Sequence, residues 1–215
     1  MKDTLTQYQY KDFFGSLLMG DRISCSQKIQ LLQTYGLSIP DIYENVLKTS
    51  LYKIGELWEY NKISVATEHL ASAIVESILN ELHFNLISDK KNNKAAILAC
   101  VENESHQIGI KMIGDVFEMN EWNTFFLGAN TPTDELFQFA KTKKPNIFAF
   151  SLSLYFNLPA LEKTIQKTQI EFPTIPILVG GQAFTHGGQE VLLKYQNVVY
   201  QPNLESTQQY IKNVL

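Results

Sequence analysis

The sequence predicts an α + α/β protein, in which an N-terminal four-helix bundle precedes a doubly wound domain with a five-stranded parallel sheet. Three observations support this. Apolar residues recur every three or four positions over residues 1–88, which is the helical period. From residue 95 onward, short continuous apolar runs alternate with helical stretches, as in a parallel sheet covered on both faces. A polar segment, "DKKNNK" at 89–94, separates the two patterns and predicts two domains, 1–90 and 94–215.

Four segments of the first region have amphipathic helical periodicity. Glycine ends the first two, and Ser64 has the residue type preferred at the N-cap of the fourth. Because the links between them are short, we expect neighbouring helices to pack antiparallel as a bundle. The predicted helices cover residues 4–20, 21–36, 38–61 and 64–89.

Five short apolar runs in the second region predict strands, and a helical stretch follows each of them. Five such βα units fit a flavodoxin- or Rossmann-like domain, which binds ligands at the carboxyl ends of its strands. The predicted strands are 95–101, 123–128, 146–153, 175–181 and 198–202, and the predicted helices are 106–119, 132–142, 157–170, 186–195 and 204–213.

Bulk composition limits the classes of function. The 215 residues are 45% hydrophobic and 19% charged, with a net charge of −4, which is ordinary for a globular protein. No basic run is long enough to follow a phosphate backbone, so direct nucleic-acid binding is not expected. Neither a secretory signal nor a membrane span is recognisable, which predicts a cytoplasmic protein. Cys25 and Cys100 are predicted to be buried free thiols in a reducing compartment.

The predicted loop after the first strand contains Glu104, His106 and Gly109 in an E-x-H-x-x-G pattern. A histidine at this corner projects at the edge of the sheet where ligands bind. A carboxylate two residues earlier can accept the imidazole N–H and make the other ring nitrogen a better metal ligand. Since no second histidine or cysteine is near in sequence, a closed zinc site is disfavoured. A single protein ligand suits a metal whose other positions a macrocycle fills.

Two more loops are predicted at the same edge. Ser151 and Ser153 lie at the end of the third strand, and Gly180 and Gly181 at the end of the fourth. Either feature alone also fits ordinary turn chemistry at a strand end. Combined with the histidine, the hydroxyl pair and the double glycine predict a deep slot for a long ligand.

On these residues the sequence resembles cobalamin-binding proteins of the corrinoid-carrier and methionine-synthase type. Their motif is D-x-H-x-x-G, then S-x-L or a variant, then G-G. The resemblance implies that His106 is the lower axial ligand of cobalt, that Glu104 orients His106, and that Gly109 lets the ligand approach. Glutamate stands here in place of the aspartate of the motif.

The same resemblance assigns the other loops to the nucleotide tail of cobalamin, which the histidine displaces from cobalt. It implies that Ser151, together with Gly180 and Gly181, lines the slot for this tail. Ser153 stands where many members have leucine, and it is included among the predicted cofactor contacts.

A second resemblance concerns the helical region. Trp58 precedes Glu68 and His69 in a W-x9-E-H pattern similar to that of the CarH/LitR group of adenosylcobalamin light sensors. By themselves these residues also fit a buried tryptophan beside a surface Glu-His pair. The resemblance implies that Trp58 packs over the upper axial 5′-deoxyadenosyl group and that Glu68 and His69 contact it. Glu59 stands where these sensors often have histidine, so His69 is the candidate upper cobalt ligand after light.

These resemblances imply a non-enzymatic adenosylcobalamin-binding light sensor or signalling module. Photolysis of the Co–C bond would change the packing of the bundle and thereby the assembly of the protein. Because the DNA-binding domain of the group is missing from this sequence, we expect a light-dependent homo-oligomer that acts through a partner protein. A corrinoid methyl carrier of a methyltransferase system is the alternative, and a flavodoxin-like domain with another ligand is a third. Trp58 with Glu68 and His69 favours the sensor, since a methyl group must stay accessible to partner enzymes.

Overall fold

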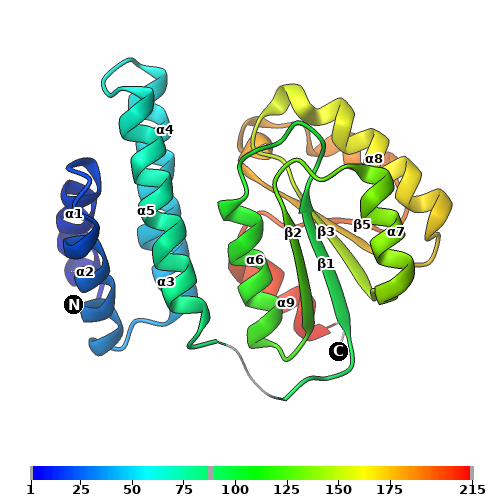
Figure 1. Ribbon diagram of the computed structural model, residues 1–215, viewed down its shortest axis with the longest axis horizontal. Coiled ribbons are helices and arrows are strands. Elements are labelled where there is room, and N and C mark those ends of the chain that lie inside the picture. The colour runs from blue at the N-terminus through cyan, green and yellow to red at the C-terminus, as the bar shows by residue number, and fades with distance from the viewer. Residues whose placement is uncertain (1, 87–89, 214–215) are drawn as a thin grey trace. The chain divides into compact units, whose positions relative to one another are not determined.

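The computed structural model describes residues 2–86 and 90–213 and divides the chain into two compact units, residues 1–85 and 86–215. The first unit is helical, and the second is a five-stranded parallel sheet covered by helices (Figure 1). The predicted fold class is therefore confirmed. Residues 87–89, at the end of the predicted helix 64–89, lie outside the described residues, and so does the first residue of the predicted boundary segment 89–94. No helix within the two described ranges is long and apolar enough to cross a membrane.

Each of the last three helical segments of the first unit begins at a side-chain cap. Asp21, Ser38 and Ser64 accept hydrogen bonds from the backbone N–H three residues later, which satisfies a donor that the first turn leaves unpaired. The segments are α1 (Lys2–Leu18), α2 (Arg22–Thr34), a composite of α3 (Ile39–Ile42), η1 (Tyr43–Lys48) and α4 (Thr49–Glu59), and finally α5 (Val65–His83). Their buried faces form a core that includes Phe13, Leu17, Ile29, Leu32, Ile78 and Leu79.

The composite third segment is one continuous helix whose middle, η1, is π-helical. Its buried residues include a series at steps of four: Ile42, Val46, Ser50 and Ile54. In a pure α-helix of 3.6 residues per turn, each such step would rotate the buried side by about 40° away from the core. The wider π-helical turn absorbs this rotation and keeps the series on one face.

The sheet of the second unit has the strand order β2-β1-β3-β4-β5, and every pair of neighbours is parallel. The central strands β1 and β3 are buried at every residue, which explains why their sequences are continuously apolar. Since all strands point the same way, the loops that follow them meet at one edge. The strands are β1 (Ala95–Cys100), β2 (Asn123–Gly128), β3 (Ile147–Ser151), β4 (Ile177–Gly180) and β5 (Val198–Tyr200).

Helices cover both faces of the sheet, as the alternation of strands and helices predicts. Figure 1 shows α6 (Ile108–Met119) and α9 (Leu204–Asn213) on one face, and α7 (Thr133–Lys143) and α8 (Leu158–Glu171) on the other. The core under α7 and α8 contains Leu136, Phe148, Phe150, Leu161 and Ile165.

The predicted helix over 186–195 is wrong. Two 3-10 turns occupy this region, η3 (Gln182–His186) and η4 (Gln189–Lys194). Between them, Gly187 and Gly188 have φ values of 109° and 90°, which an α-helix does not accept. A third short turn, η2 (Tyr155–Asn157), follows β3 and leads directly into α8.

The chain just before β1 is bound to the α/β unit. Lys91 Nζ donates to the Trp122 carbonyl at 3.2 Å, and Asn92 N donates to the Glu121 carbonyl at 2.8 Å. Lys94 Nζ lies 5.5 Å from the centre of the buried Trp122 ring. These contacts fix residues 91–94 on the turn between α6 and β2, so this part of the polar segment 89–94 is ordered by the second unit.

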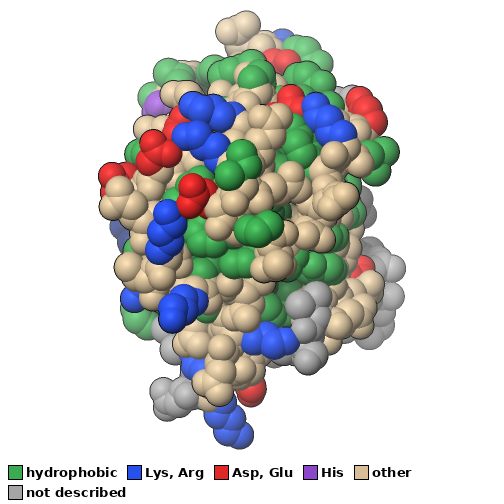
Figure 2. Space-filling model, turned by 90° about the vertical axis from the view of Figure 1, so that its right-hand side faces the viewer, with side chains coloured by type: hydrophobic (Ala, Val, Ile, Leu, Met, Phe, Trp, Pro, Cys, Tyr) green, Lys and Arg blue, Asp and Glu red, His purple; other side chains and the backbone are tan. Residues whose placement is uncertain are grey.

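Charge is mixed on the face of the α/β unit that carries α7 and α8. Figure 2 shows basic and acidic side chains close together there, with apolar side chains between them. Lys141 pairs with Glu171 at 2.9 Å, and Lys167 pairs with Asp134 at 3.0 Å. These pairs join α7 to α8, although exposed pairs of this kind add little to stability.

The π-helical segment generates a prediction about Ser50. Its Oγ is buried and has no hydrogen-bond partner among the described residues, and it lies just after η1. Because an unpaired buried hydroxyl costs roughly 1–3 kcal/mol, Ser50→Ala should stabilise the helical unit by about 1 kcal/mol. Amide hydrogen exchange in α4 of the full chain should then slow about fivefold. Thr49→Ala is the matched control. It removes a bond of 3.1 Å to the Glu44 carbonyl and should not slow exchange.

Candidate functional site

Glu104 is fully buried in the loop that follows β1, and donors from two loops surround its carboxylate. Oε1 accepts from His106 N at 3.1 Å and lies 2.5 Å from His106 Nδ1. Oε2 accepts from Ser153 N and Leu154 N, both at 3.0 Å, in the loop that follows β3. Asn157 Nδ2 is a further donor to Oε2 at 3.4 Å. A buried carboxylate requires such partners, and these partners fix Glu104 in place.

The same hydrogen bonds determine the charge of Glu104. Burial raises the pKa of Glu104, but the His106 side chain and the N–H groups of Leu154, His106 and Ser153 outweigh it and lower the pKa to about 2. Glu104 is therefore ionised at neutral pH. A carboxylate on Nδ1 keeps the proton on that nitrogen, which directs Nε2 to act as a metal ligand. The His106 side chain is 53% exposed, as a ligand residue at the edge of the sheet must be.

The main chain of His106 also contacts the end of β1. Burial raises the pKa of Cys100 to about 12, so its thiol stays protonated. Cys100 Sγ donates to the His106 carbonyl at 3.5 Å. The predicted burial of both cysteines, Cys25 and Cys100, is confirmed.

Gly109 lies in the first turn of α6, three residues after His106. A Cβ at this position would meet no atom within 4 Å, so the packing of the protein does not require glycine there. Glycine in a helix costs up to about 1 kcal/mol relative to alanine. An open, glycine-lined surface beside an oriented histidine fits a bulky corrinoid that takes His106 as its single protein ligand. In the described part of the chain, no three His, Cys, Asp or Glu side chains cluster as they would around a bare metal ion.

The two predicted serines have different positions. Ser151 is the buried last residue of β3 and lies in register between Cys100 of β1 and Gly180 of β4. Ser153 is partly buried, and its backbone N–H, rather than its hydroxyl, is bound to Glu104. Their predicted contacts with a nucleotide tail stay predictions.

The two predicted glycines are required by the backbone of the protein itself. A Cβ at Gly180 would lie 2.9 Å from the Gln201 carbonyl oxygen. Gly181 has a φ of +119°, and a Cβ there would lie 2.2 Å from the Leu152 carbonyl oxygen. Both glycines therefore allow the loop after β4 to pack closely on its neighbours. That they also border a ligand slot stays a prediction.

The remaining predicted residues belong to the helical unit. Trp58, in the last turn of α4, is 49% exposed, which contradicts the alternative of a buried tryptophan. Glu68 and His69 lie in the first turns of α5, with Glu68 Oε2 3.5 Å from His69 Nε2. The His69 side chain is 74% exposed, and Glu68 Oε1 accepts from Ser72 Oγ at 2.9 Å. An aromatic surface, a carboxylate and an imidazole are thus accessible near the ends of these two helices.

Asn157 is absent from the predicted site, although it joins two loops of it. The residue is buried, and its Nδ2 donates to the Asn103 carbonyl at 3.1 Å as well as to Glu104. An asparagine in an otherwise apolar stretch, "LYFNLPAL", is the one signal in the sequence. The partners of its side chain are more than fifty residues away, so the sequence does not indicate the role of Asn157.

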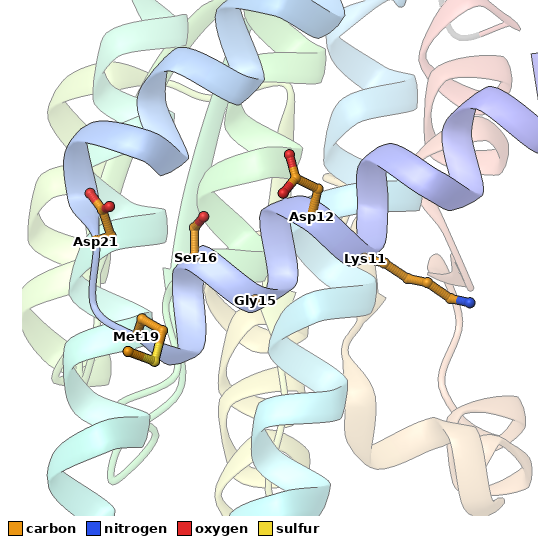
Figure 3. Close-up of a pocket in the computed structure, with 6 residues that line it drawn as sticks. All are labelled: Lys11, Asp12, Gly15, Ser16, Met19 and Asp21. Carbon is orange, nitrogen blue, oxygen red and sulfur yellow. The ribbon is translucent and has the colours of Figure 1, made fainter.

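The helical unit has a hollow of about 360 Å³ that none of these residues lines, and Figure 3 labels the residues that do. The polar side chains of Asp12, Ser16 and Asp21 are engaged within that unit. Asp12 pairs with Lys28 at 3.1 Å, Lys28 donates to Ser16 at 2.8 Å, and Asp21 caps α2. The hollow therefore reflects the turn between α1 and α2, and nothing in it points to a ligand. Its lining residues are Lys11, Asp12, Gly15, Ser16, Met19 and Asp21.

A helical unit, a doubly wound α/β unit and one carboxylate-oriented histidine at the sheet edge define a corrinoid-binding class of protein. Residues 94–207 match a family described as the B12 binding domain, and residues 10–83 match a second family of the same description. The chain belongs to the B12 binding domain family and is a cobalamin-binding protein.

Two relatives come from Myxococcus xanthus. The HTH-type transcriptional repressor CarA is 26% identical over 120 residues, which are 56% of this chain and 41% of CarA. The HTH-type transcriptional repressor CarH is 26% identical over 145 residues, 66% of this chain and 47% of CarH. The matched part is thus less than half the length of either relative. The monomethylamine corrinoid protein of Methanosarcina barkeri has the same fold, with a TM-score of 0.83, 14% identity, and 97% of this chain and 99% of that chain covered.

Gly109 gives a prediction that separates stability from binding. Gly109→Ala should stabilise the ligand-free protein by up to about 1 kcal/mol, because alanine is the better helix former and the added methyl meets no atom. The same methyl should weaken cobalamin binding about tenfold, measured by equilibrium titration. Gly114→Ala, in the same helix, is the control. Its Cβ would lie 3.6 Å from Thr124 Cγ2 in ordinary contact, and cobalamin affinity should not change.

The low pKa of Glu104 predicts an acid-dependent loss of stability in the ligand-free protein. A folded pKa of about 2, below the ordinary 4.5, means that the stabilisation is complete above about pH 4.5 and is lost as the pH falls toward 2. The difference corresponds to about 3 kcal/mol. In urea unfolding, Glu104→Gln should be less stable than the wild type at pH 7, and the gap should narrow steadily below pH 4.5. A gap that is independent of pH would contradict the assignment.

Proposed function

We propose that this chain is a non-enzymatic adenosylcobalamin-binding light sensor. The α/β unit would bind the corrinoid through His106, and the helical unit would respond to the upper axial group. The observation that carries the proposal is the exposure of Trp58 and of His69, which lies 3.5 Å from the partly buried Glu68. A half-exposed tryptophan contributes less to stability than a buried one and leaves an aromatic face open to a ligand with an aromatic base, and the Glu68–His69 pair of the next helix offers polar groups.

Each of these residues has a defined task in the proposal. When bound, adenosylcobalamin would supply a Co–C bond that visible light breaks. Trp58 would offer stacking area to the adenine, and Glu68 with His69 would offer hydrogen bonds to the base and ribose. Loss of the adenosyl group would remove these contacts from the helical unit, and His69 is the side chain that would then hold the cobalt.

The proposed signal depends on contacts that the adenosyl group makes with one arrangement of the helices and not with the other. A ligand shifts a protein between two arrangements only by binding one of them better, and the adenosyl group would do so through α4 and α5. We propose that its loss changes helix packing, alters a homo-oligomeric assembly, and so signals to a partner protein in the cytoplasm. Support comes from the W-x9-E-H pattern and from the match to CarH over 66% of the chain.

The second candidate function is a corrinoid methyl carrier for a methyltransferase system. The observation that favours it is the likeness in fold, over 97% of this chain, to a monomethylamine corrinoid protein. A methyl carrier makes no use of a recognition group for adenosine, so the role of Trp58 distinguishes the two candidates.

The test begins with the ligand-free chain loaded with adenosylcobalamin in the dark. Its visible spectrum and size-exclusion profile are recorded before and after illumination. The sensor predicts loss of the alkylcobalamin bands together with a change of oligomeric state. An unchanged profile, combined with methyl transfer from methylcobalamin-loaded protein to a thiol acceptor in the presence of a methyltransferase, would favour the carrier instead.

Trp58→Ala provides the matched mutational prediction. It should reduce the preference for adenosylcobalamin over methylcobalamin about tenfold in equilibrium titrations, because stacking on an aromatic ring contributes about 1 kcal/mol or more. Tyr60→Ala removes another exposed aromatic ring two residues away and should leave that preference unchanged. Equal preferences in the wild type and Trp58→Ala would refute the assignment of Trp58.

A further inference from the structure

We propose that Asn130, in the loop after β2, is a positioning residue for His106. The loop after β3 fixes Glu104 from one side, and we infer that the loop after β2 holds the main chain around His106 from another. The inference rests on His106 as the cobalt ligand and is independent of any response to light.

Asn130 makes two hydrogen bonds to the segment just before His106. Its backbone N–H donates to the Glu104 carbonyl at 2.8 Å. Its side-chain Oδ1 accepts from Asn103 N, also at 2.8 Å. One residue of the β2 loop therefore binds two consecutive residues of the ligand loop. We call these two bonds the Asn130 clasp.

The backbone conformation selects asparagine at both ends of the clasp. Asn130 has a φ of 47° and Asn103 a φ of 66°, a left-handed region that most residues avoid and asparagine tolerates. Glycine would accept this conformation too, but it has no side-chain oxygen to bind the Asn103 N–H. Position 130 thus requires a residue that tolerates a left-handed φ and also has a side-chain hydrogen-bond acceptor.

A third bond holds the segment just after His106. Gln107 Oε1 accepts from Ala129 N at 3.1 Å. The preceding residue, Gly128, has a φ of 79°, and a Cβ there would lie 2.7 Å from Gln107 Oε1. Glycine at 128 therefore lets Gln107 reach the β2 loop. The loop binds the chain at residues 103, 104 and 107, on both sides of His106 in sequence.

This arrangement constrains the histidine more than it stabilises the fold. Asn130 and Asn103 are both exposed and make no part of the core, so their side-chain bond adds little to global stability. The bond does limit rotation of the main chain that carries His106. A histidine that is already held in the right direction binds cobalt without a further entropic cost of ordering its side chain and loop.

Two substitutions isolate the side-chain bond. Asn130→Gly keeps the left-handed φ and the N–H that binds Glu104, but it removes Oδ1. Asn130→Asp keeps the acceptor and the tolerance for this φ. Asn197→Gly is the matched control, since Asn197 is also exposed, has a φ of 58°, and binds another loop through Nδ2 to the Pro173 carbonyl at 3.2 Å.

Three measurements are made on the full chain. Hydrogen exchange of the Asn103 amide reports the clasp in the ligand-free protein. The visible spectrum of bound cobalamin reports the fraction with histidine coordinated, and titration gives the dissociation constant. Asn130→Gly should lose about tenfold protection at Asn103, lower the coordinated fraction, and weaken binding three- to tenfold with little change in melting temperature. Asn130→Asp and Asn197→Gly should resemble the wild type.

A His106→Ala background completes the test, because a positioning effect must vanish when the positioned ligand is absent. There, Asn130→Gly should not weaken cobalamin binding further. The proposal would be overturned if Asn130→Gly left the hydrogen exchange of Asn103 unchanged. It would also be overturned if Asn130→Gly lost this protection but kept the spectrum and affinity of the wild type. An equal loss of affinity in the His106→Ala background would overturn it as well. If the wild type itself lacks a histidine-coordinated spectrum, the ligand assignment of His106 fails and the positioning role fails with it.

Discussion

The geometry of the site depends on the cost of burying an ionised carboxylate. Glu104 is buried, and its charge is stable only because the loops after β1 and β3 supply donors to both of its oxygens. Neither loop could move far without leaving that charge uncompensated, which is among the most expensive defects a protein interior can have. The pairing with Nδ1 then decides which nitrogen of His106 serves as the ligand. The position and the tautomer of His106 thus follow from one buried group.

The order of the strands in the sheet brings these loops together around Glu104 and His106. With the order β2-β1-β3-β4-β5, the strand that carries the histidine loop lies between the two strands whose loops hold it. The loop after β3 contributes main-chain donors and Asn157, and the loop after β2 contributes Asn130. Close backbone packing at Gly181 fits the β4 loop against the same edge. The site is therefore assembled by neighbouring loops rather than by neighbouring residues in sequence.

In the helical unit, two features are not predicted by helical periodicity: the π-helical turn and the exposure of Trp58. Its third segment has buried residues at steps of four, and a π-helical turn accommodates that spacing. Helical periodicity alone predicts the segment from 38 to 61 but cannot distinguish one wide turn within it. Helical periodicity also does not predict the exposure of Trp58, because an apolar residue in the last turn of a helix is buried or exposed depending on its neighbours in space.

The sequence alone determined the two-unit architecture, because helical and strand periods differ and continuous apolar runs require a sheet buried on both faces. It also determined the Glu104–His106 pair, whose members are two residues apart and interact locally. Only the tertiary structure decided which groups hold that pair, since Asn157 lies more than fifty residues from Asn103, and Asn130 is also distant. It likewise replaced the helix predicted over 186–195 with 3-10 turns. Hydrogen bonds between distant loops depend on how strands are ordered in space, and local patterns carry no record of that order.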